Sequence, residues 1–211
     1  MSQPAASTAD RHPMPGMMVY NVKLGMWIFL LSEVMFFTAL IGSYIILRFA
    51  HPDHFAEPGA VLNVPLTAFN TFVLICSSVS MVKAYAAITQ GDQKGLKFWL
   101  LVTILLGTFF VGVQVYEYII LAQEGFVPMV ELYGVAHEIE GAALYGATFY
   151  TMTGFHGTHV TIGILCMWFV LYRAWQGKYS ADNYGGVEIM GLYWHFVDLV
   201  WIILFTIVYL I

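Results

Sequence analysis

Five long apolar stretches divide the chain, and short polar segments separate them. A helix needs about 20 mostly apolar residues to cross the hydrocarbon core of a bilayer. Each stretch reaches that length, and they run over residues 24–47, 66–88, 98–121, 144–172 and 190–211. The pattern therefore predicts an all-α, polytopic membrane protein built as a bundle of five transmembrane helices.

The segments outside these stretches leave no room for a soluble domain. Residues 1–22 form a polar tail whose Pro, Ala and Ser content predicts disorder. The tail has neither the apolar core nor the basic cluster of a secretory signal. We therefore expect a peripheral N-terminal tail over 1–22 and one transmembrane domain over 23–211.

Composition supports this assignment. The chain is 60% hydrophobic and 10% charged, whereas ordinary soluble domains carry about 25% charged residues. The formal net charge of −5 gives no reason to expect a nucleic-acid partner. Cys76 and Cys166 both fall inside predicted spans without a C-x-x-C pattern, so we interpret them as small packing residues.

The basic residues are divided unequally between the two sides of the predicted bundle. Seven of the eight Lys and Arg residues fall on the side of the N-terminus, and only Arg48 falls on the other. Cytoplasmic loops of membrane proteins carry this excess of positive charge. We therefore predict a cytoplasmic N-terminus and, after five spans, a C-terminus outside.

Two carboxylates lie inside predicted spans. Glu33 lies about 14 Å along the first helix and Asp198 about 12 Å along the fifth, measured from the same side at 1.5 Å per residue. A charge at mid-bilayer costs at least about 2.5 to 3.5 kcal/mol on insertion scales. Such a group must face the protein interior, pair or take up a proton. We expect Glu33 to be largely protonated near neutral pH. A role in proton or lipid chemistry and a role in packing alone are both compatible with its position.

Three histidines and a further carboxylate add to the polar set. His156 and His159 are three residues apart on the fourth span, a spacing that suits either a metal or haem site or two separate interhelical hydrogen bonds. His195 precedes Asp198 by three, so a hydrogen bond between them is feasible on one helix face. Glu117 falls near the outer end of the third span, where we expect a structural role.

Five segments together resemble, in this order, segments of subunit III of haem-copper terminal oxidases, also called cytochrome c oxidase subunit III. They are KLGMWIFLLSEVMFF (23–37), VPLTAFNTFVLICSSVS (64–80), QVYEY (114–118), GFHGTHVTIG (154–163) and YWHFVDLVWIILF (193–205). The resemblance covers the chain from Lys23 to the C-terminus, and an ordered set on five spans is far more specific than any single motif.

The resemblance implies an accessory subunit of the respiratory complex that reduces dioxygen and pumps protons. Such a subunit is not catalytic alone and binds no haem or copper, since these centres belong to partner subunits I and II. It stabilises subunit I, holds phospholipid in a cleft, supports proton uptake and guides dioxygen. The resemblance thus favours structural roles for His156, His159 and His195. It also implies that the protein lies in the cytoplasmic (inner) membrane of a bacterium.

Three residues match positions of known importance in the family. Glu33 matches its buried, carbodiimide-reactive glutamate, which we assign to proton uptake and the lipid cleft. Arg173 matches a basic residue that meets lipid phosphate, and Glu188 matches a glutamate before the last helix. The seven-helix form of the family begins with two more helices, and this chain instead resembles its five-helix bacterial form. Its outer loop, 123–143, is long, and we expect it to contact a further partner.

Other functions compete with this interpretation. Cytochrome c and quinol oxidases share the subunit, so the electron donor stays open. A proton-coupled carrier also uses buried acids and histidines, but five spans without repeated halves do not suit alternating access. A haem-binding cytochrome would use the histidines of the fourth span.

Overall fold

The structure is a computed structural model that describes residues 15–55, 57–124, 126 and 142–210. Five long helices dominate these residues, and two short helical turns and a C-terminal π-helical turn accompany them. The long helices are α1 (Pro15–Ala50), α3 (Val64–Thr89), α4 (Gln93–Gln123), α6 (Ala142–Trp175) and α7 (Gly185–Phe205), and the short elements are η1 (Pro52–His54), α2 (Pro58–Val61) and η2 (Thr206–Leu210).

All five long helices are long and apolar enough to cross a membrane, over residues 21–50, 64–89, 93–123, 144–175 and 185–210. The predicted all-α architecture with five transmembrane helices is therefore confirmed. Residues 1–14 of the expected tail and most of the outer loop 123–143 lie outside the described residues. The side of the membrane that each end faces stays a prediction.

Local sequence signals set the helix boundaries. Asn63 caps α3 by accepting a hydrogen bond from the backbone N–H of Leu66, and a proline occupies the first turn of that helix. Asp92 caps α4 by accepting from the N–H groups of Lys94 and Gly95. Between the two helices Gly91 adopts φ of 79°, a conformation that glycine takes without steric cost. A tight turn therefore makes α3 and α4 antiparallel neighbours.

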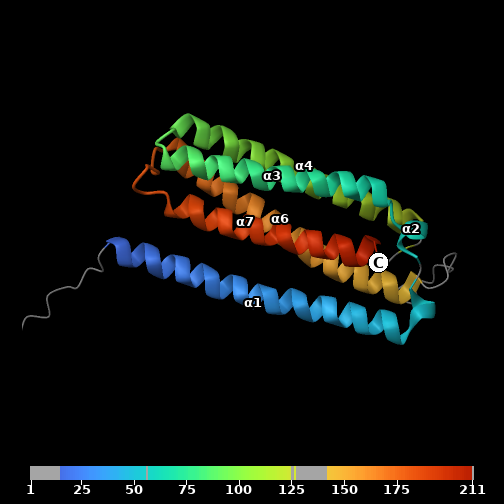
Figure 1. Cartoon of the computed structure of the whole chain (residues 1–211). Coiled ribbons are helices and arrows are strands. Elements are labelled where there is room, and N and C mark those ends of the chain that lie inside the picture. The colour runs from blue at the N-terminus through green and yellow to red at the C-terminus, as the bar shows by residue number, and fades with distance from the viewer. Residues whose placement is uncertain (1–14, 56, 125, 127–141, 211) are drawn as a thin grey trace, which may run out of the picture.

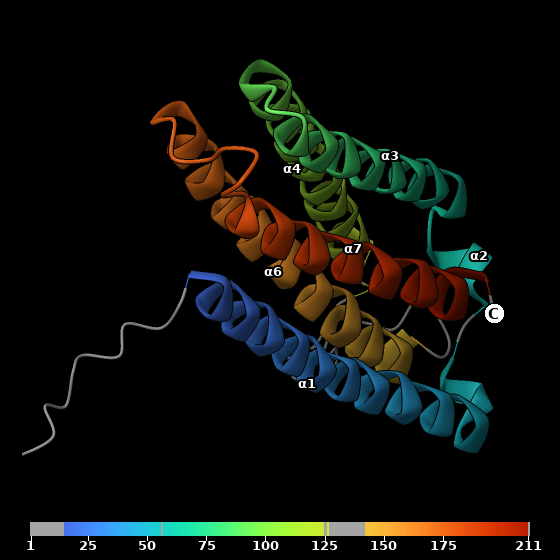
Figure 2. The ribbon, with the colours of Figure 1, turned by 60° about the vertical axis from the view of Figure 1, so that its left-hand side comes forward.

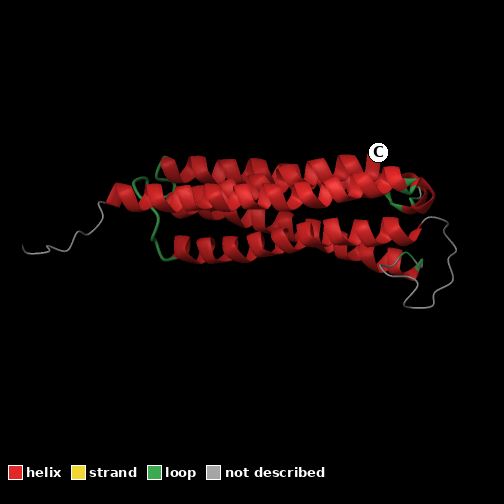
Figure 3. Cartoon of the chain, turned by 90° about the horizontal axis from the view of Figure 1, so that it is seen from below, coloured by secondary structure: helices red, strands yellow, loops and turns green. Residues whose placement is uncertain are grey.

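The helices form two layers. One layer holds α1, α7 and α3, with α7 in the middle, and the other holds α6 and α4 (Figures 1 and 3). Helix α7 packs on α3 and α6, and α4 packs on α3 and α6. Helix α1 lies at the edge, where it contacts only α7 and α6 among the long helices to any extent (Figure 2). Most large apolar side chains of α1 are consequently exposed.

Polar side chains of α3 join it to its neighbours inside the bundle. Ser80 pairs with Thr103 of α4, while Ser77 and Thr71 accept hydrogen bonds from the indole N–H groups of Trp194 and Trp201 of α7. These side chains are all buried. Hydrocarbon offers no hydrogen-bond partner, so pairing between helices is the way to satisfy such groups. Helix α3 is therefore fixed in rotation by hydrogen bonds as well as by packing.

Trp194 fills the centre of the bundle because two glycines make room for it. A Cβ at Gly107 of α4 would lie 2.7 Å from its ring, and a Cβ at Gly163 of α6 would lie 3.0 Å from it. The ring is 1% exposed. Small residues at helix contacts let backbones approach closely in membranes. Here they let one large side chain bridge α4, α6 and α7.

Gly107→Ala should therefore destabilise the protein by about 1–3 kcal/mol, the usual cost of overpacking a filled core. The midpoint of thermal unfolding in detergent measures the effect. Gly112→Ala is the matched control, because it makes the same change on the same helix where a Cβ would meet nothing within 4 Å. Equal midpoints for the two variants would contradict the packing argument.

Candidate functional site

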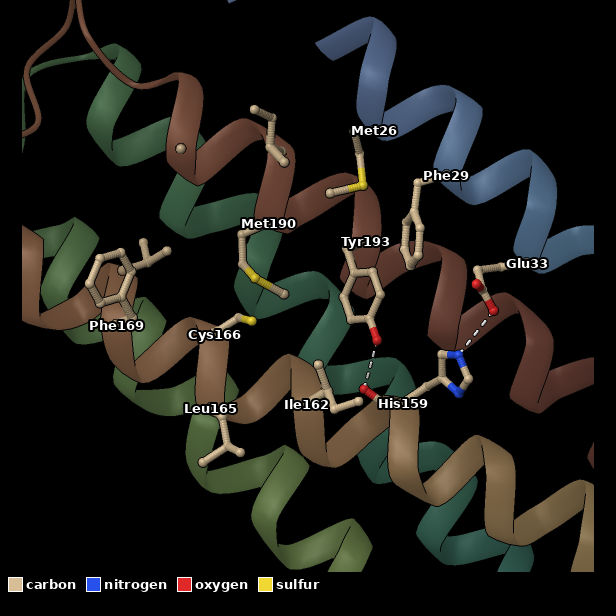
Figure 4. Close-up of a pocket in the computed structure, with 13 residues that line it drawn as sticks. Met26, Phe29, Glu33, His159, Ile162, Leu165, Cys166, Phe169, Met190 and Tyr193 are labelled. Carbon is tan, nitrogen blue, oxygen red and sulfur yellow. Dashed lines mark hydrogen bonds and ion pairs between the residues drawn. The ribbon is translucent and has the colours of Figure 1, made fainter. Parts of the chain in front are cut away.

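An apolar pocket of about 760 Å³ opens between α1, α6 and α7 (Figure 4). Ligand-binding pockets commonly have volumes of about 300–1,000 Å³. Most side chains that line this pocket are apolar or contain sulfur, and they include Met26, Phe29, Ile162, Leu165, Cys166, Phe169 and Met190. The lining contains four ionisable side chains: Cys166, Tyr193, Glu33 and His159. The pocket is thus mostly apolar, and Glu33 and His159 form one pair of polar side chains in its wall.

Glu33 and His159 contact each other across the pocket wall. The carboxylate Oε2 of Glu33 lies 3.0 Å from Nε2 of His159 (Figure 4). Nδ1 of the same imidazole lies 2.7 Å from the backbone carbonyl of Phe155, one turn earlier on α6. The side chains of the pair are only 17% and 16% exposed. Both ring nitrogens of His159 are therefore engaged.

The Phe155 carbonyl determines how the pair holds protons. A carbonyl oxygen can only accept, so Nδ1 of His159 must carry a proton. Nε2 then either accepts a hydrogen bond from a protonated Glu33 or donates one to the carboxylate. In both arrangements one proton lies between Nε2 and Oε2, and the charges of the pair sum to zero. A neutral pair is the form that costs least beside hydrocarbon.

Aromatic side chains enclose the histidine. The ring of Phe37 meets it edge-on at 5.1 Å between centroids, and Phe36 lies 6.3 Å away. The hydroxyl of Tyr193 on α7 donates to the backbone carbonyl of His159 at 2.9 Å. The three helices that form the pocket therefore meet at this residue.

Arg173 lies at the end of α6 that the sequence assigns to the cytoplasmic side. Its Cζ atom lies 5.9 Å from the ring centre of Phe169, a pocket residue, and 5.6 Å from that of Tyr179. Burial raises the pKa of the Tyr179 hydroxyl, and the nearby guanidinium opposes that shift. A cation over aromatic faces is held in place without losing its donors. The guanidinium thus lies beside the pocket, and no hydrogen bond to another described residue engages its N–H groups, which can therefore meet an anion.

Glu188 joins α7 to α1 at the same end. Lys23 Nζ donates to Glu188 Oε1 at 2.5 Å, and both side chains keep some contact with the surroundings, at 41% and 23% exposed. Exposed ion pairs contribute little to stability, about 0–1 kcal/mol. The contact joins α7 to α1 at one end of the two helices.

Over residues 7–211 the sequence matches the family described as cytochrome c oxidase subunit III. The chain belongs to the cytochrome c oxidase subunit III family. The predicted resemblance is therefore confirmed over nearly the whole chain.

Relatives carry names from two kinds of oxidase. A cytochrome c oxidase subunit 3 from Thermostichus vulcanus is 37% identical over 89% of this chain and 86% of its own length. A protein of the same name from Synechocystis sp. is 38% identical over 94% of this chain and 78% of its own. A probable quinol oxidase subunit 3 from Staphylococcus aureus is 33% identical over 90% and 88%.

The remaining predicted site residues of this subunit III chain lie apart from the pocket. His156 is fully buried, and its ring lies 4.8 Å from that of Trp201 and 5.9 Å from that of Phe110. Neither of its nitrogens has a hydrogen-bond partner within the described part of the chain. His156 and His159 therefore have different neighbours and do not converge on one point.

His195 and Asp198 are near each other on α7, but no hydrogen bond joins them. Asp198 instead accepts a hydrogen bond at Oδ2 from the hydroxyl of Ser78 on α3 at 2.6 Å, and its Oδ1 is buried without a partner among the described residues. His195 is half-buried. The i, i+3 spacing made a hydrogen bond between His195 and Asp198 feasible, but Asp198 bonds to the hydroxyl of Ser78 on the neighbouring helix α3 instead.

Glu117 is buried near the outer end of α4. It accepts hydrogen bonds from the hydroxyl of Thr67 at 3.0 Å and from that of Tyr209 at 3.1 Å. These contacts join α4 to α3 and η2 and are those expected of a structural residue. Its structural role is still a prediction.

The two cysteines and the possible metal ligands are the last of the predicted site features. Cys76 is half-buried, Cys166 is exposed, and both are free thiols. Within the residues that the structure describes, no group of three or more His, Cys, Asp or Glu side chains is placed to hold a metal ion. Cys166 lines the pocket, a position that its place in the sequence did not predict.

Sequence reasoning also missed the partner of Glu33. The depth of Glu33 along α1 was available from the sequence, and so was the presence of two histidines on the fourth span. Which histidine faces α1 depends on the rotation of α6 within the bundle, and no local signal specifies it. Of the two, the structure brings only His159 to Glu33.

The contact between Glu33 and His159 should appear as an energetic coupling. We expect the variants Glu33→Gln and His159→Phe, alone and combined, to give a coupling of roughly 0.6 kcal/mol and at most about 1.7 kcal/mol, the average and the maximum measured for interhelical hydrogen bonds in a membrane protein. Unfolding by SDS in mixed micelles measures the four free energies of the cycle.

Thr158→Val serves as the control in place of His159→Phe. Its hydroxyl bonds only within α6, to the carbonyl of Gly154, so its cycle with Glu33→Gln should give no coupling. If both cycles were additive within error, Glu33 and His159 would not interact in the folded protein.

Proposed function

We propose that this chain is a non-redox accessory subunit of a respiratory terminal oxidase, the complex that couples dioxygen reduction to proton pumping. The match to the subunit III family over residues 7–211 carries this proposal. Haem and copper then belong to partner subunits, with subunit I as the main contact and subunit II as a second. Five apolar helices make the chain a multi-pass membrane protein, and we assign it to the cytoplasmic membrane of a bacterium.

The pocket between α1, α6 and α7 suits the acyl chains of phospholipid. Its walls are apolar over most of their extent, and it reaches toward Arg173 through Phe169. A guanidinium can hold a phosphate by charge-assisted hydrogen bonds. In this proposal lipid chains fill the pocket while Arg173 binds the headgroup. Ordered lipid there would stabilise the adjoining wall of subunit I.

Glu33 gives the same pocket a proton-accepting group. The shared proton of Glu33 and His159 keeps the pair neutral beside the lipid chains. The shared proton can move between Nε2 of His159 and Oε2 of Glu33 without changing the net charge of the pair, whereas its release would leave one negative charge beside hydrocarbon. In this proposal Glu33 supports proton uptake by subunit I, and the apolar space around it lets dioxygen approach. The outer loop 123–143, largely outside the described residues, is the proposed contact for a further partner.

The electron donor of the complex is cytochrome c or quinol. Relatives named for cytochrome c oxidase are 37% and 38% identical over most of the chain, and one named for quinol oxidase is 33% identical. The comparison favours the cytochrome c form, and the quinol form is the second candidate.

Purification by a tag on this chain tests the assignment. In mild detergent the preparation should contain the larger oxidase subunits and show the absorption bands of their haem, while the tagged chain separated from them should show none. A chain that purifies alone, with no oxidase subunit, would overturn the proposed function.

Arg173→Gln should reduce the phospholipid that stays with the purified complex. Hydrogen bonds to charged groups contribute about 1.5–3 kcal/mol, so lipid retention should weaken roughly tenfold or more. Phosphorus analysis after extended washing in detergent measures the loss.

Lys178→Gln is the matched control for this measurement, because Lys178 is an exposed cation in the loop that follows α6. Its loss should leave the lipid content unchanged. Equal phosphorus content in both variants would remove Arg173 from the lipid site.

A further inference from the structure

A second polar site lies on a face of the bundle that no other helix of the described chain covers. Helix α7 runs between α1 and α3 in one layer (Figure 1), and His195, Asp198, Leu199 and Ile202 lie on one side of α7 by their i, i+3, i+4 and i+7 spacing. Leu199 and Ile202 are exposed there, His195 is half-buried, and Asp198 is buried against Ser78 of α3. On α3, Ile75 and Val82 flank Ser78, the partner of Asp198, at the same kind of spacing. We call these seven residues the α3–α7 face.

The carboxylate of Asp198 is incompletely satisfied. Its side chain is 8% exposed, Ser78 donates to Oδ2 at 2.6 Å, and Oδ1 is buried with no hydrogen-bond partner in the described part of the chain. The ion pairs found among the described residues are Lys23 with Glu188 and His159 with Glu33, so none involves Asp198. A buried acceptor without a partner costs about 1–3 kcal/mol, and more when it is charged.

His195 lies next to this carboxylate, and its hydrogen bonding is also incomplete. The imidazole is half-buried near the middle of α7, and neither nitrogen makes a hydrogen bond within the described residues. A rotation of its ring would let one N–H donate to Oδ1 of Asp198, because residues three apart lie on one face of a helix. The other nitrogen would then point outward at mid-membrane depth. Lipid chains offer that nitrogen no partner.

The surroundings of this polar pair suit a helix better than lipid. Leu199 and Ile202 are exposed on α7, as are Ile75 and Val82 on α3. Exposed apolar side chains are compatible with lipid and with a transmembrane helix alike. The half-buried imidazole favours a transmembrane helix over lipid, since polar residues within membranes almost always face protein or a water-filled cavity.

We propose that the α3–α7 face binds a transmembrane helix of another oxidase subunit. In the complex that helix presents a hydroxyl, amide or indole group to His195, whose ring in turn donates to Oδ1 of Asp198. The inference rests on the proposed function, because it takes the partner to be a subunit of the same oxidase. It assigns the docking to a face distinct from the pocket, where Glu33 already has its partner within this chain.

Photo-crosslinking in native membranes tests the location. A benzophenone amino acid in place of Leu199, which is 57% exposed, should crosslink this chain to one larger oxidase subunit. The same probe in place of Leu105 on α4, 58% exposed, is the control for a general lipid-facing position. Both sites are exposed, so the probe need not disturb the fold.

A Leu199 probe that labels only lipid, or that gives only a dimer of this chain, would overturn the proposed face. Crosslinks from Leu105 with none from Leu199 would overturn it as well. The proposed function is judged separately, because it stands whenever the tagged chain still co-purifies with oxidase subunits.

A second measurement tests the chemistry. His195→Leu should lower the fraction of this chain that co-purifies with the larger subunits by roughly threefold, as expected for one interhelical hydrogen bond. His195→Gln, which keeps a donor and an acceptor, should restore much of it. If His195→Leu assembled as well as the unaltered chain, the imidazole would have no role in docking.

Discussion

Polar side chains inside the membrane must find partners on other helices, and this requirement organises the bundle. Hydrocarbon cannot hydrogen-bond, so polar groups at that depth depend on partners within protein, and His156 and Oδ1 of Asp198 are exceptions that have none among the described residues. Helix α3 meets the requirement on two sides, toward α4 and toward α7. Its pairs are Thr67 with Glu117, Asn70 with the Phe110 carbonyl, Thr71 with Trp201, Ser77 with Trp194, Ser78 with Asp198 and Ser80 with Thr103. These contacts hold α3, α4 and α7 in one rotational setting.

Helix α1 depends on the same requirement in a different way. It buries few apolar side chains against the rest of the bundle, and packing alone therefore specifies its position weakly. Glu33 to His159 near mid-membrane and Lys23 to Glu188 at one end connect it to α6 and α7. The space that remains between these connections is the pocket. The two polar contacts thus connect α1 to the helices that form the rest of the pocket wall.

The sequence predicts the five helices because hydropathy and length are local properties, and each span could be read without its neighbours. It predicts the depth of Glu33 and Asp198 for the same reason, since depth follows from position along a helix. It does not predict their partners, which depend on how each helix is rotated in the bundle. His159 shares a spacing motif with His156 yet faces another helix, and Asp198 accepts from Ser78, 120 positions away, rather than from His195.

The two carboxylates at similar depth therefore differ in what the chain supplies to each. At Glu33, the Phe155 carbonyl fixes a proton on Nδ1 of His159, so that the remaining proton of the pair lies between the two side chains and the charges cancel. This site is complete within one polypeptide and can border a lipid-filled pocket. Asp198 has one hydroxyl donor and a neighbouring imidazole without hydrogen bonds. If the imidazole of His195 donates to Oδ1 of Asp198, its other nitrogen still needs a partner, and a second chain must supply it because the bilayer cannot. An accessory subunit that stabilises a larger neighbour gains specificity from such an incomplete site, since a wrong partner leaves the imidazole of His195 unpaired.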